Sequence, residues 1–256
     1  MELKDTWGLI LGGSSGLGLE SAKKLASHGM NLLILHRDRR ADMYGIQAEF
    51  DEIRKNGIEV ISFNKDALKA DTLQEVIESL PDRSLKLLLH SLAKGAVKPL
   101  ISDDKPTLTA TDLDLTLRAM GSSLLDWAQT LIKEDKFSEK GRIIGFTSEG
   151  NSRAWPAYGA ISAAKGVLEA LLRQMALEYA RYGITSNIIQ AGTTDTPALR
   201  QLPSHEKLLT MAERRNPFGR LTRPQDVANL VYLLCLPEAD WINGSLIKAD
   251  GGESLR

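Results

Sequence analysis

Short apolar runs alternate with helix-length amphipathic segments along the chain, and this alternation is the feature that most constrains its fold. It is typical of repeated strand–helix–strand units, which build a mostly parallel sheet. Seven segments are predicted to be strands: 7–11, 31–35, 59–63, 85–90, 142–146, 184–190 and 245–249. Six segments between them are predicted to be helices: 18–28, 41–55, 72–79, 111–133, 157–181 and 224–236. Most of the strands are continuous apolar runs, so we expect a seven-stranded, doubly wound α/β sheet with helices on both faces.

The bulk composition limits the number of domains and the kinds of partner. A chain of 256 residues, 43% of them hydrophobic, can bury one large core, and we expect a single domain over residues 1–256. The 32 basic and 33 acidic residues leave no overall field to attract nucleic acid or an anionic membrane. The N-terminus resembles no signal peptide, and no apolar stretch approaches the roughly 20 residues of a membrane-spanning helix. We expect a soluble, cytoplasmic protein that binds neither nucleic acid nor membranes.

Cysteine and histidine usage argues against disulfide and metal chemistry. The only cysteine, Cys235, has no partner for a disulfide within the chain. It lies in an apolar run and is predicted to be a small core residue. The four histidines are far apart in sequence and show no metal-ligand spacing, so we expect no metal site.

A glycine-rich turn follows the first predicted strand and leads into a predicted helix. Its sequence is Gly12-Gly13-Ser14-Ser15-Gly16-Leu17-Gly18. Glycines allow a tight turn and the close approach of a pyrophosphate, while the free N–H groups and positive dipole end of the helix favour an anion. In this context the turn predicts the dinucleotide site of a Rossmann fold. The alternative is a turn whose small residues serve packing alone.

The tip of the second predicted strand indicates which dinucleotide binds. NAD-binding folds of this kind carry an acidic residue about 20 positions beyond the glycines, where it holds the ribose hydroxyls. The corresponding position here is His36, followed by Arg37. A guanidinium suits the 2′-phosphate of NADP, because it binds phosphate through a planar fork of donors, so NADPH is favoured. Asp38 keeps NADH open, and a merely solvated charged loop is the other interpretation.

These residues resemble the short-chain dehydrogenase/reductase family over nearly the whole chain. The resemblance includes the glycine turn, a Tyr and a Lys on a late helix, and a C-terminal Ala249-Asp250-Gly251-Gly252. Three departures stand out. Most members place the tyrosine four residues before the lysine, but here that residue is Ile161, and Tyr158 lies seven residues before Lys165. The usual Asn-Asn-Ala-Gly run is His90-Ser91-Leu92-Ala93 and the usual asparagine of the next helix is Met120; the usual Pro-Gly after the sixth strand is Ala191-Gly192.

Together, the departures resemble the enoyl-acyl-carrier-protein reductase branch of the family. The stretch from Thr196-Pro197-Ala198-Leu199 through Asn216-Pro217-Phe218-Gly219-Arg220 resembles the NADPH-using bacterial form of that enzyme. That branch shares the Tyr-x6-Lys spacing, the His-Ser-Leu-Ala segment and a turn like Gln190-Ala191-Gly192-Thr193-Thr194-Asp195-Thr196. The resemblance implies NADPH-dependent reduction of a trans-2-enoyl thioester in fatty-acid synthesis, with the acyl group on acyl carrier protein or coenzyme A. It also implies a homotetramer, with the 157–181 helix and the C-terminal strand as contacts.

The spacing of the tyrosine and the lysine fits this chemistry. Residues four and seven apart both lie on one face of a helix, about 6 and about 10.5 Å along its axis. In reduction of an enoyl thioester, hydride goes to the β-carbon and charge appears on an oxygen three bonds away, which suits a displaced tyrosine. We therefore expect Tyr158 to hold the developing enolate oxygen and Lys165 to orient cofactor and substrate. Ser148, at the end of the fifth strand, is a candidate second donor.

The remaining cofactor contacts are assigned on the resemblance. They are Asp66 and Ala67 after the third strand, the Ser91-Leu92-Ala93 segment, and Gly192, Thr194 and Thr196 after the sixth strand. Asp66 has the alternative role of a helix cap, and Ser91 and Ala93 have that of ending a strand. The long stretch 193–220, which contains three prolines, is interpreted as a substrate flap with a short helix.

Two other functions stay open on the sequence. One is a reductase or dehydrogenase of a ketone, a ketoacyl thioester or a hydroxysteroid. The seven-residue spacing of Tyr158 and Lys165 argues against this function without excluding it. The other is a non-catalytic NADPH-binding scaffold, which is expected to have lost Tyr158 or Lys165, although both are present.

Overall fold

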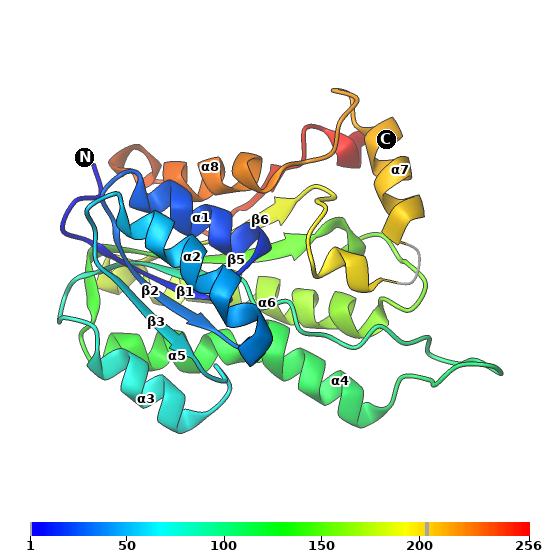
Figure 1. The fold of residues 1–256 in the computed structure, drawn as a ribbon, viewed down its shortest axis with the longest axis horizontal. Coiled ribbons are helices and arrows are strands. Elements are labelled where there is room, and N and C mark those ends of the chain that lie inside the picture. The colour runs from blue at the N-terminus through cyan, green and yellow to red at the C-terminus, as the bar shows by residue number, and fades with distance from the viewer. Residues whose placement is uncertain (1, 203–204) are drawn as a thin grey trace.

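A computed structural model describes residues 2–202 and 205–256, and within them the chain forms one seven-stranded parallel sheet (Figure 1). Its strand order is β3-β2-β1-β4-β5-β6-β7. The strands are β1 Trp7–Leu11, β2 Asn31–His36, β3 Val60–Asn64, β4 Leu85–His90, β5 Phe137–Ser148, β6 Thr185–Ala191 and β7 Leu246–Ala249. The predicted doubly wound Rossmann sheet is confirmed, because the strand order reverses direction between β1 and β4.

Helices cover both faces of the sheet. They are α1 Gly16–Ala26, α2 Met43–Arg54, α3 Ala70–Glu78, α4 Ala110–Leu117, α5 Ser123–Lys133, α6 Gly159–Glu178, α7 His205–Arg215 and α8 Pro224–Cys235. Figure 1 shows α1, α2 and α8 on one face and α3, α5 and α6 on the other. Helix α7 lies apart from both layers, beyond the carboxyl ends of the strands. No helix in the described part of the chain is long and apolar enough to cross a membrane.

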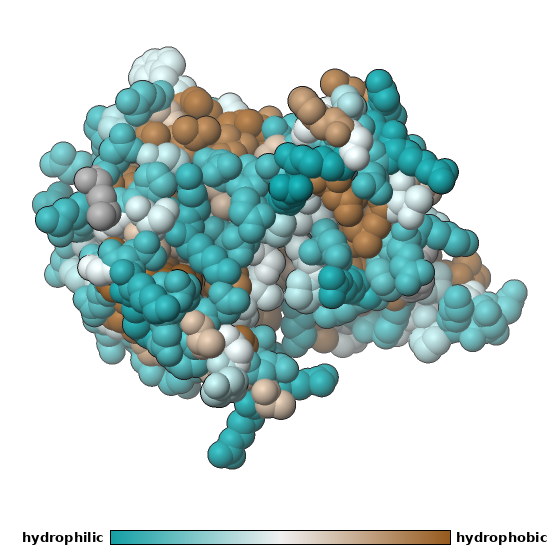
Figure 2. All heavy atoms as spheres, turned by 45° about the horizontal axis from the view of Figure 1, so that its top comes forward, coloured by the Kyte–Doolittle hydropathy of each residue, from teal (hydrophilic) through white to brown (hydrophobic). Residues whose placement is uncertain are grey.

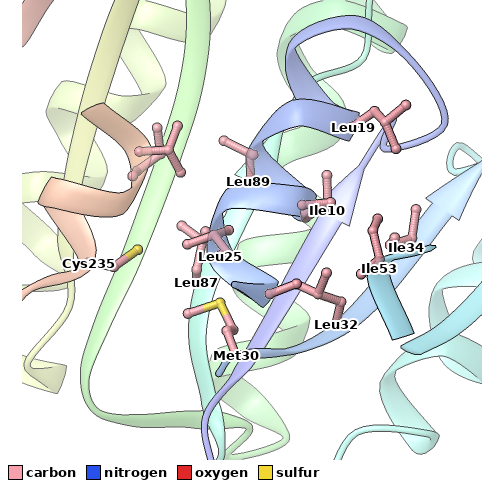
Figure 3. Packing of buried hydrophobic residues seen from close by; sticks show 14 of the residues in the cluster. Ile10, Leu19, Leu25, Met30, Leu32, Ile34, Ile53, Leu87, Leu89 and Cys235 are labelled. Carbon is pink, nitrogen blue, oxygen red and sulfur yellow. The ribbon is translucent and has the colours of Figure 1, made fainter. Parts of the chain in front are cut away.

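The strands feed two separate hydrophobic cores because successive side chains point to opposite faces. Ile10 packs with α1 and α8 on one face, while Leu9 and Leu11 pack with α3, α5 and α6 on the other. Figure 3 shows the first core, which also contains Cys235. That thiol is fully buried, and burial raises its pKa to about 12, so the predicted role of Cys235 as an unreactive core residue is confirmed.

Two predicted helices differ from the observed ones. The helix predicted over 111–133 is interrupted by a π-helical segment, Arg118–Ser122, between α4 and α5. At Gly121 an added Cβ would lie 2.8 Å from the Ala164 carbonyl oxygen, so α6 approaches the backbone closely at this interruption. The helix predicted over 157–181 begins later, at Gly159, because Ala157 has a φ of 63°, which no right-handed helix accepts, and it ends earlier, at Glu178. Tyr158 is therefore the residue before α6. The predicted distance of about 10.5 Å assumed that all seven residue steps from Tyr158 to Lys165 are helical, and the first of them is not.

Candidate active site

The carboxyl ends of the central strands open into a cavity of about 890 Å³, large enough for a dinucleotide and part of a substrate. Figure 2 shows this hollow beside the segment that carries α7, with hydrophobic residues inside it. The predicted site residues that line it are Gly12, Ser14, Ser15, Gly16, Leu17, Arg37, Asp66, Ala67, Ser91, Leu92, Ala93, Ser148, Tyr158, Lys165, Gly192, Thr194 and Thr196. Gly18 is the one predicted residue that does not line it, because it faces the turn itself.

The glycine turn is held by close backbone packing. Gly12 has a φ of 90°, and a Cβ there would lie 2.7 Å from the Ser91 carbonyl oxygen. A Cβ on Gly18 would lie 2.1 Å from the Gly12 carbonyl oxygen. These two glycines are therefore required by backbone packing. The same packing brings the start of α1 to the cavity, where neither an acidic side chain nor the hydroxyl of Ser15 caps its first turn. Its free N–H groups can hold a pyrophosphate.

Polar side chains from β2 and β3 form the far end of the cavity. The Arg37 Nη1 donates to Asp66 Oδ2 over 2.5 Å, and Asp66 Oδ1 accepts from the Leu68 backbone N–H over 3.1 Å. His36 is buried, and its Nδ1 lies 2.8 Å from Asp38 Oδ2. The carboxylate that kept NADH open is thus engaged with His36, while the Arg37 guanidinium is exposed at the cavity edge and can meet a phosphate.

Two hydroxyl groups meet near the middle of the cavity. The Ser148 Oγ, at the end of β5, lies 3.0 Å from the Tyr158 hydroxyl oxygen. The tyrosine ring packs on Gly150, where a Cβ would come within 2.4 Å of Tyr158 Cε1. Ala157, directly before the tyrosine, holds a strained left-handed conformation. Burial raises the pKa of Tyr158, so the phenol is a neutral hydrogen-bond donor at pH 7.

Lys165 brings a positive charge to the same cavity. It lies on α6 with 6% of its surface exposed, and burial lowers its pKa to about 8. The nearby Glu169 carboxylate opposes that shift, and it also accepts a hydrogen bond from Thr147 Oγ1 over 2.6 Å. The ammonium is therefore mostly protonated at pH 7.

His90, which the sequence analysis noted only as part of a motif, is a fully buried neighbour of this lysine. Burial, and next the charge of Lys165, lower the His90 pKa to about 3, so the ring is neutral. Its Nε2 lies 3.1 Å from Ser123 Oγ, which itself donates to the Ala119 carbonyl oxygen over 3.2 Å. This network assigns the proton to Nε2. At pH 7, therefore, Lys165 is charged and His90 is neutral.

Comparisons with known proteins identify the family. The family profile described as Enoyl-(Acyl carrier protein) reductase matches residues 12–254. A short chain dehydrogenase from Burkholderia cenocepacia, solved in complex with NADP, superposes with a TM-score of 0.84 at 26% identity, over 99% of this chain and 100% of that one. The chain belongs to the short-chain dehydrogenase/reductase family. It is thus an oxidoreductase, which confirms the coarser part of the predicted function.

Other relatives of this short-chain dehydrogenase/reductase carry varied names. It is 28% identical over 252 residues to the uncharacterized oxidoreductase YjdA of Bacillus subtilis, covering 95% of each chain. It is 29% identical over 253 residues to a tropinone reductase homolog of Arabidopsis thaliana, covering 96% of this chain and 90% of the relative. The promiscuous reductase LugOII, which catalyses keto-reduction at C1 during lugdunomycin biosynthesis, superposes with a TM-score of 0.85 at 25% identity over the full length of both chains.

The position four residues before the lysine carries no polar group in this short-chain dehydrogenase/reductase. Ile161 is 8% exposed and packs in a small apolar cluster with Met120 and Ala164. Gly95 lies against the cluster, because a Cβ there would be 2.8 Å from both Ile161 and Met120. Of the described tyrosines, Tyr158 is the one that lines the cavity, so it is the one placed to act there.

The sequence analysis missed the apolar wall of the substrate side. Residues from the segment after β4, the turn before α6 and the flap line it: Val97, Met120, Trp155, Ile161, Leu199, Leu202 and Leu208. Only the flap boundaries were predicted. No single periodic pattern marks these residues, because they come from separate helices and loops that meet only in the folded chain.

Proposed function

We propose that this oxidoreductase uses NADPH to reduce a carbonyl group, with Ser148 and Tyr158 holding the carbonyl oxygen. The observation that carries the proposal is the 3.0 Å contact between the two hydroxyl groups in the cavity that also contains Lys165. Two adjacent O–H groups can both donate to one oxygen on which negative charge develops. The tropinone reductase homologs and the keto-reducing LugOII among its relatives support this reading. Carbonyl reduction was the alternative in the sequence analysis, and it accounts for the comparisons better than enoyl reduction does.

NADPH fits the residues that are present. The uncapped start of α1 suits the pyrophosphate, and the exposed Arg37 guanidinium suits the 2′-phosphate. Asp38, the acid that would favour the ribose hydroxyls of NADH, is engaged with His36. The related Burkholderia enzyme was solved with NADP. Bound NADPH supplies the hydride.

The protein residues hold the oxygen and its proton. Tyr158 is neutral, because burial raises its pKa, and its O–H donates to the substrate oxygen and passes the proton to it as charge develops. Ser148 supplies a second hydrogen bond to the same oxygen. The protonated Lys165 stabilises the phenolate that remains, and it orients the nicotinamide ribose. The apolar wall around Trp155 excludes water from the reacting atoms.

A second candidate is reduction of an enoyl thioester, the main prediction from the sequence. Two observations favour it: the seven-residue step from Tyr158 to Lys165, and the description of the matching family profile. The hydroxyl pair would then hold an enolate oxygen instead of an alkoxide. The protein machinery is the same, and the two reactions differ in the carbon that accepts the hydride.

One assay separates the two reactions. The wild-type enzyme is given NADPH with simple cyclic ketones, a ketoacyl thioester and a trans-2-enoyl thioester, and loss of NADPH absorbance is followed. We expect turnover of at least one carbonyl substrate, with kcat/KM above that for the enoyl thioester. Turnover of the enoyl thioester alone contradicts the proposal and establishes the second candidate. NADPH binding without turnover of any substrate supports the scaffold alternative.

We also propose that the protein forms a homotetramer through α6 and β7. β7 is an edge strand, and exposed apolar side chains lie on or beside both elements: Leu177 on α6, Trp241 before β7 and Leu246 on it. Unpaired edges and exposed apolar groups favour contact with another chain. Light scattering is expected to give the mass of four chains, and a mass of one chain contradicts this proposal.

A further inference from the structure

A charged network joins the substrate flap to the turn that carries the hydroxyl pair. Arg215, the last residue of α7, donates from Nη2 to Glu149 Oε2 over 2.6 Å. The same nitrogen lies 3.7 Å from Glu253 Oε1 and 3.3 Å from the Glu253 carbonyl oxygen. Only 14% of the Arg215 side chain is exposed. One guanidinium thus bridges two carboxylates from segments far apart in the sequence.

The Glu149 end of the network reaches the reacting groups. Glu149 directly follows Ser148 and begins the 3-10 turn Glu149–Asn151. Its carbonyl oxygen accepts hydrogen bonds from the backbone N–H groups of residues 152 and 153. The next residue, Gly150, packs on the ring of Tyr158. Fixing the Glu149 side chain therefore fixes the turn that flanks both hydroxyl groups.

The Glu253 end of the network reaches the start of the flap. Glu253 is 3% exposed, and its two carboxylate oxygens accept from the backbone N–H of Thr193 over 2.8 Å and from its hydroxyl over 2.7 Å. Thr193 follows Gly192, which lines the cavity. Arg215 is therefore linked to both the first residue of the flap and the end of its helix.

Asn216, the residue that follows helix α7, is buried, and its Nδ2 donates to the Asp250 carbonyl oxygen over 2.9 Å, but few other contacts anchor the helix. Ala212 is its one buried residue, so hydrophobic burial contributes little to its position. Two other ion pairs involve the flap, Arg200 with Asp195 and Arg220 with Asp226, and both are exposed and lie outside α7. Arg153 comes within 3.6 Å of Glu149 but is itself half exposed, and it comes from the catalytic turn, not from the flap.

We propose that Arg215 is a positioning residue that sets the substrate flap against the Ser148–Tyr158 pair through Glu149 and Glu253. It touches none of the reacting atoms. Its role is to hold Leu208 of α7 in the apolar wall while the turn after β5 keeps both hydroxyl groups aligned. Loss of the guanidinium leaves Glu253 without its counter-charge and Glu149 with only the half-exposed Arg153, so the link between the two segments is broken. The activity readout of this proposal rests on the proposed reductase function.

The first test compares Arg215→Gln with Arg214→Gln, its exposed neighbour on the same helix, which forms no ion pair with any described residue. Misplacement of about 1 Å at an active site can cost about 10²-fold in rate, so Arg215→Gln is expected to lower kcat/KM about 10- to 100-fold, with a higher KM and a lower kcat. The Kd for NADPH is expected to change less than KM, because the start of α1 and Arg37, which are assigned to the cofactor phosphates, lie outside the network. Arg215→Lys keeps the charge and recovers part of the loss. Arg214→Gln changes neither parameter.

A double-mutant cycle tests whether the two residues act together. Glu149→Gln is expected to reproduce part of the loss, and the Glu149→Gln/Arg215→Gln variant to be no worse than Arg215→Gln alone. Independent, additive effects overturn the proposal. So does a kcat/KM for Arg215→Gln equal to that of Arg214→Gln.

Hydrogen exchange tests the anchor without any substrate. The backbone amides of α7 are expected to exchange faster in Arg215→Gln than in the wild type or Arg214→Gln, while those of α1 stay unchanged. If no substrate of the wild-type enzyme is found, the proposed function fails, yet the exchange result still decides the anchor. Unchanged exchange in α7 overturns it. If Arg215→Gln does not fold, Arg215→Lys and Glu149→Gln are measured in the same way.

Discussion

Two turns at the same edge of the sheet build the cavity in different ways. The turn from β1 to α1 is shaped by backbone packing, with Gly12 and Gly18 at positions that admit no Cβ. The turn from β5 to α6 is shaped by side chains: the Ser148–Tyr158 contact, and the ion pair that Glu149 makes with a distant helix. The first turn therefore depends only on packing against neighbouring segments of the sheet. The second depends on segments more than 60 residues away, such as Arg215.

The largest effect is expected when the side-chain turn loses its phenol. Tyr158→Phe removes the donor to the developing oxyanion and is expected to lower kcat by about 10²–10³-fold while NADPH still binds. Tyr44→Phe, an exposed position outside the cavity, serves as the control. Steady-state kinetics and a cofactor titration measure the two properties separately. Undiminished turnover in Tyr158→Phe shows that this turn does not carry the chemistry.

A slightly smaller effect is expected when the backbone turn receives a methyl group. In Gly18→Ala the new Cβ would lie 2.1 Å from the Gly12 carbonyl oxygen, so the turn must shift, at a cost of about 1–3 kcal/mol in the free energy of unfolding. Weaker NADPH binding is expected with it. Gly45→Ala, in α2 with nothing near its Cβ, is the matched control and is expected to be stabilising by about 0.5–1 kcal/mol. Urea unfolding of both variants checks the contrast, which fails if they respond alike.

The next prediction concerns Arg37, at the cofactor end of the cavity. Arg37→Ala removes the exposed guanidinium and is expected to raise the Kd for NADPH about tenfold or more, because a charge-assisted hydrogen bond is lost. The Kd for NADH should change little. Arg40→Gln, exposed and outside the cavity, is the control. Equal losses for both cofactors contradict the assignment of Arg37 to the 2′-phosphate.

The last expected effect concerns Lys165 and the pH dependence of stability. Burial lowers its pKa from the ordinary 10.5 to about 8, so between those values the unfolded chain binds more protons than the folded one. The contribution of this residue to the free energy of unfolding therefore rises with pH through that window and is least favourable below about 8. Lys165→Met should remove this part of the slope in urea unfolding at pH 7 to 10. An unchanged slope indicates that the lysine is better solvated than its burial implies.

The sequence determined the layered sheet, the cofactor turn and the tyrosine. Alternation of apolar runs and amphipathic segments is a local property, and a parallel sheet is the arrangement that buries such runs on both faces. Gly18 is required because it packs on the backbone of Gly12 in the same turn, and Gly12 because it packs on Ser91, directly after β4. The spacing of Tyr158 and Lys165 could also be read from the sequence, because Tyr158 directly precedes the helix that carries Lys165.

Only the tertiary structure decided which segments meet at the substrate side. Arg215 pairs with Glu149, 66 residues away, and Glu253 binds Thr193, 60 residues away. In sequence each of these charged residues has the pattern of a solvated surface, and no period links them. The interruption between α4 and α5 likewise lies where Gly121 packs closely on the Ala164 carbonyl oxygen of α6. Pairing of charges and close helix contacts depend on three-dimensional proximity, which the folded chain supplies and local periodicity does not encode.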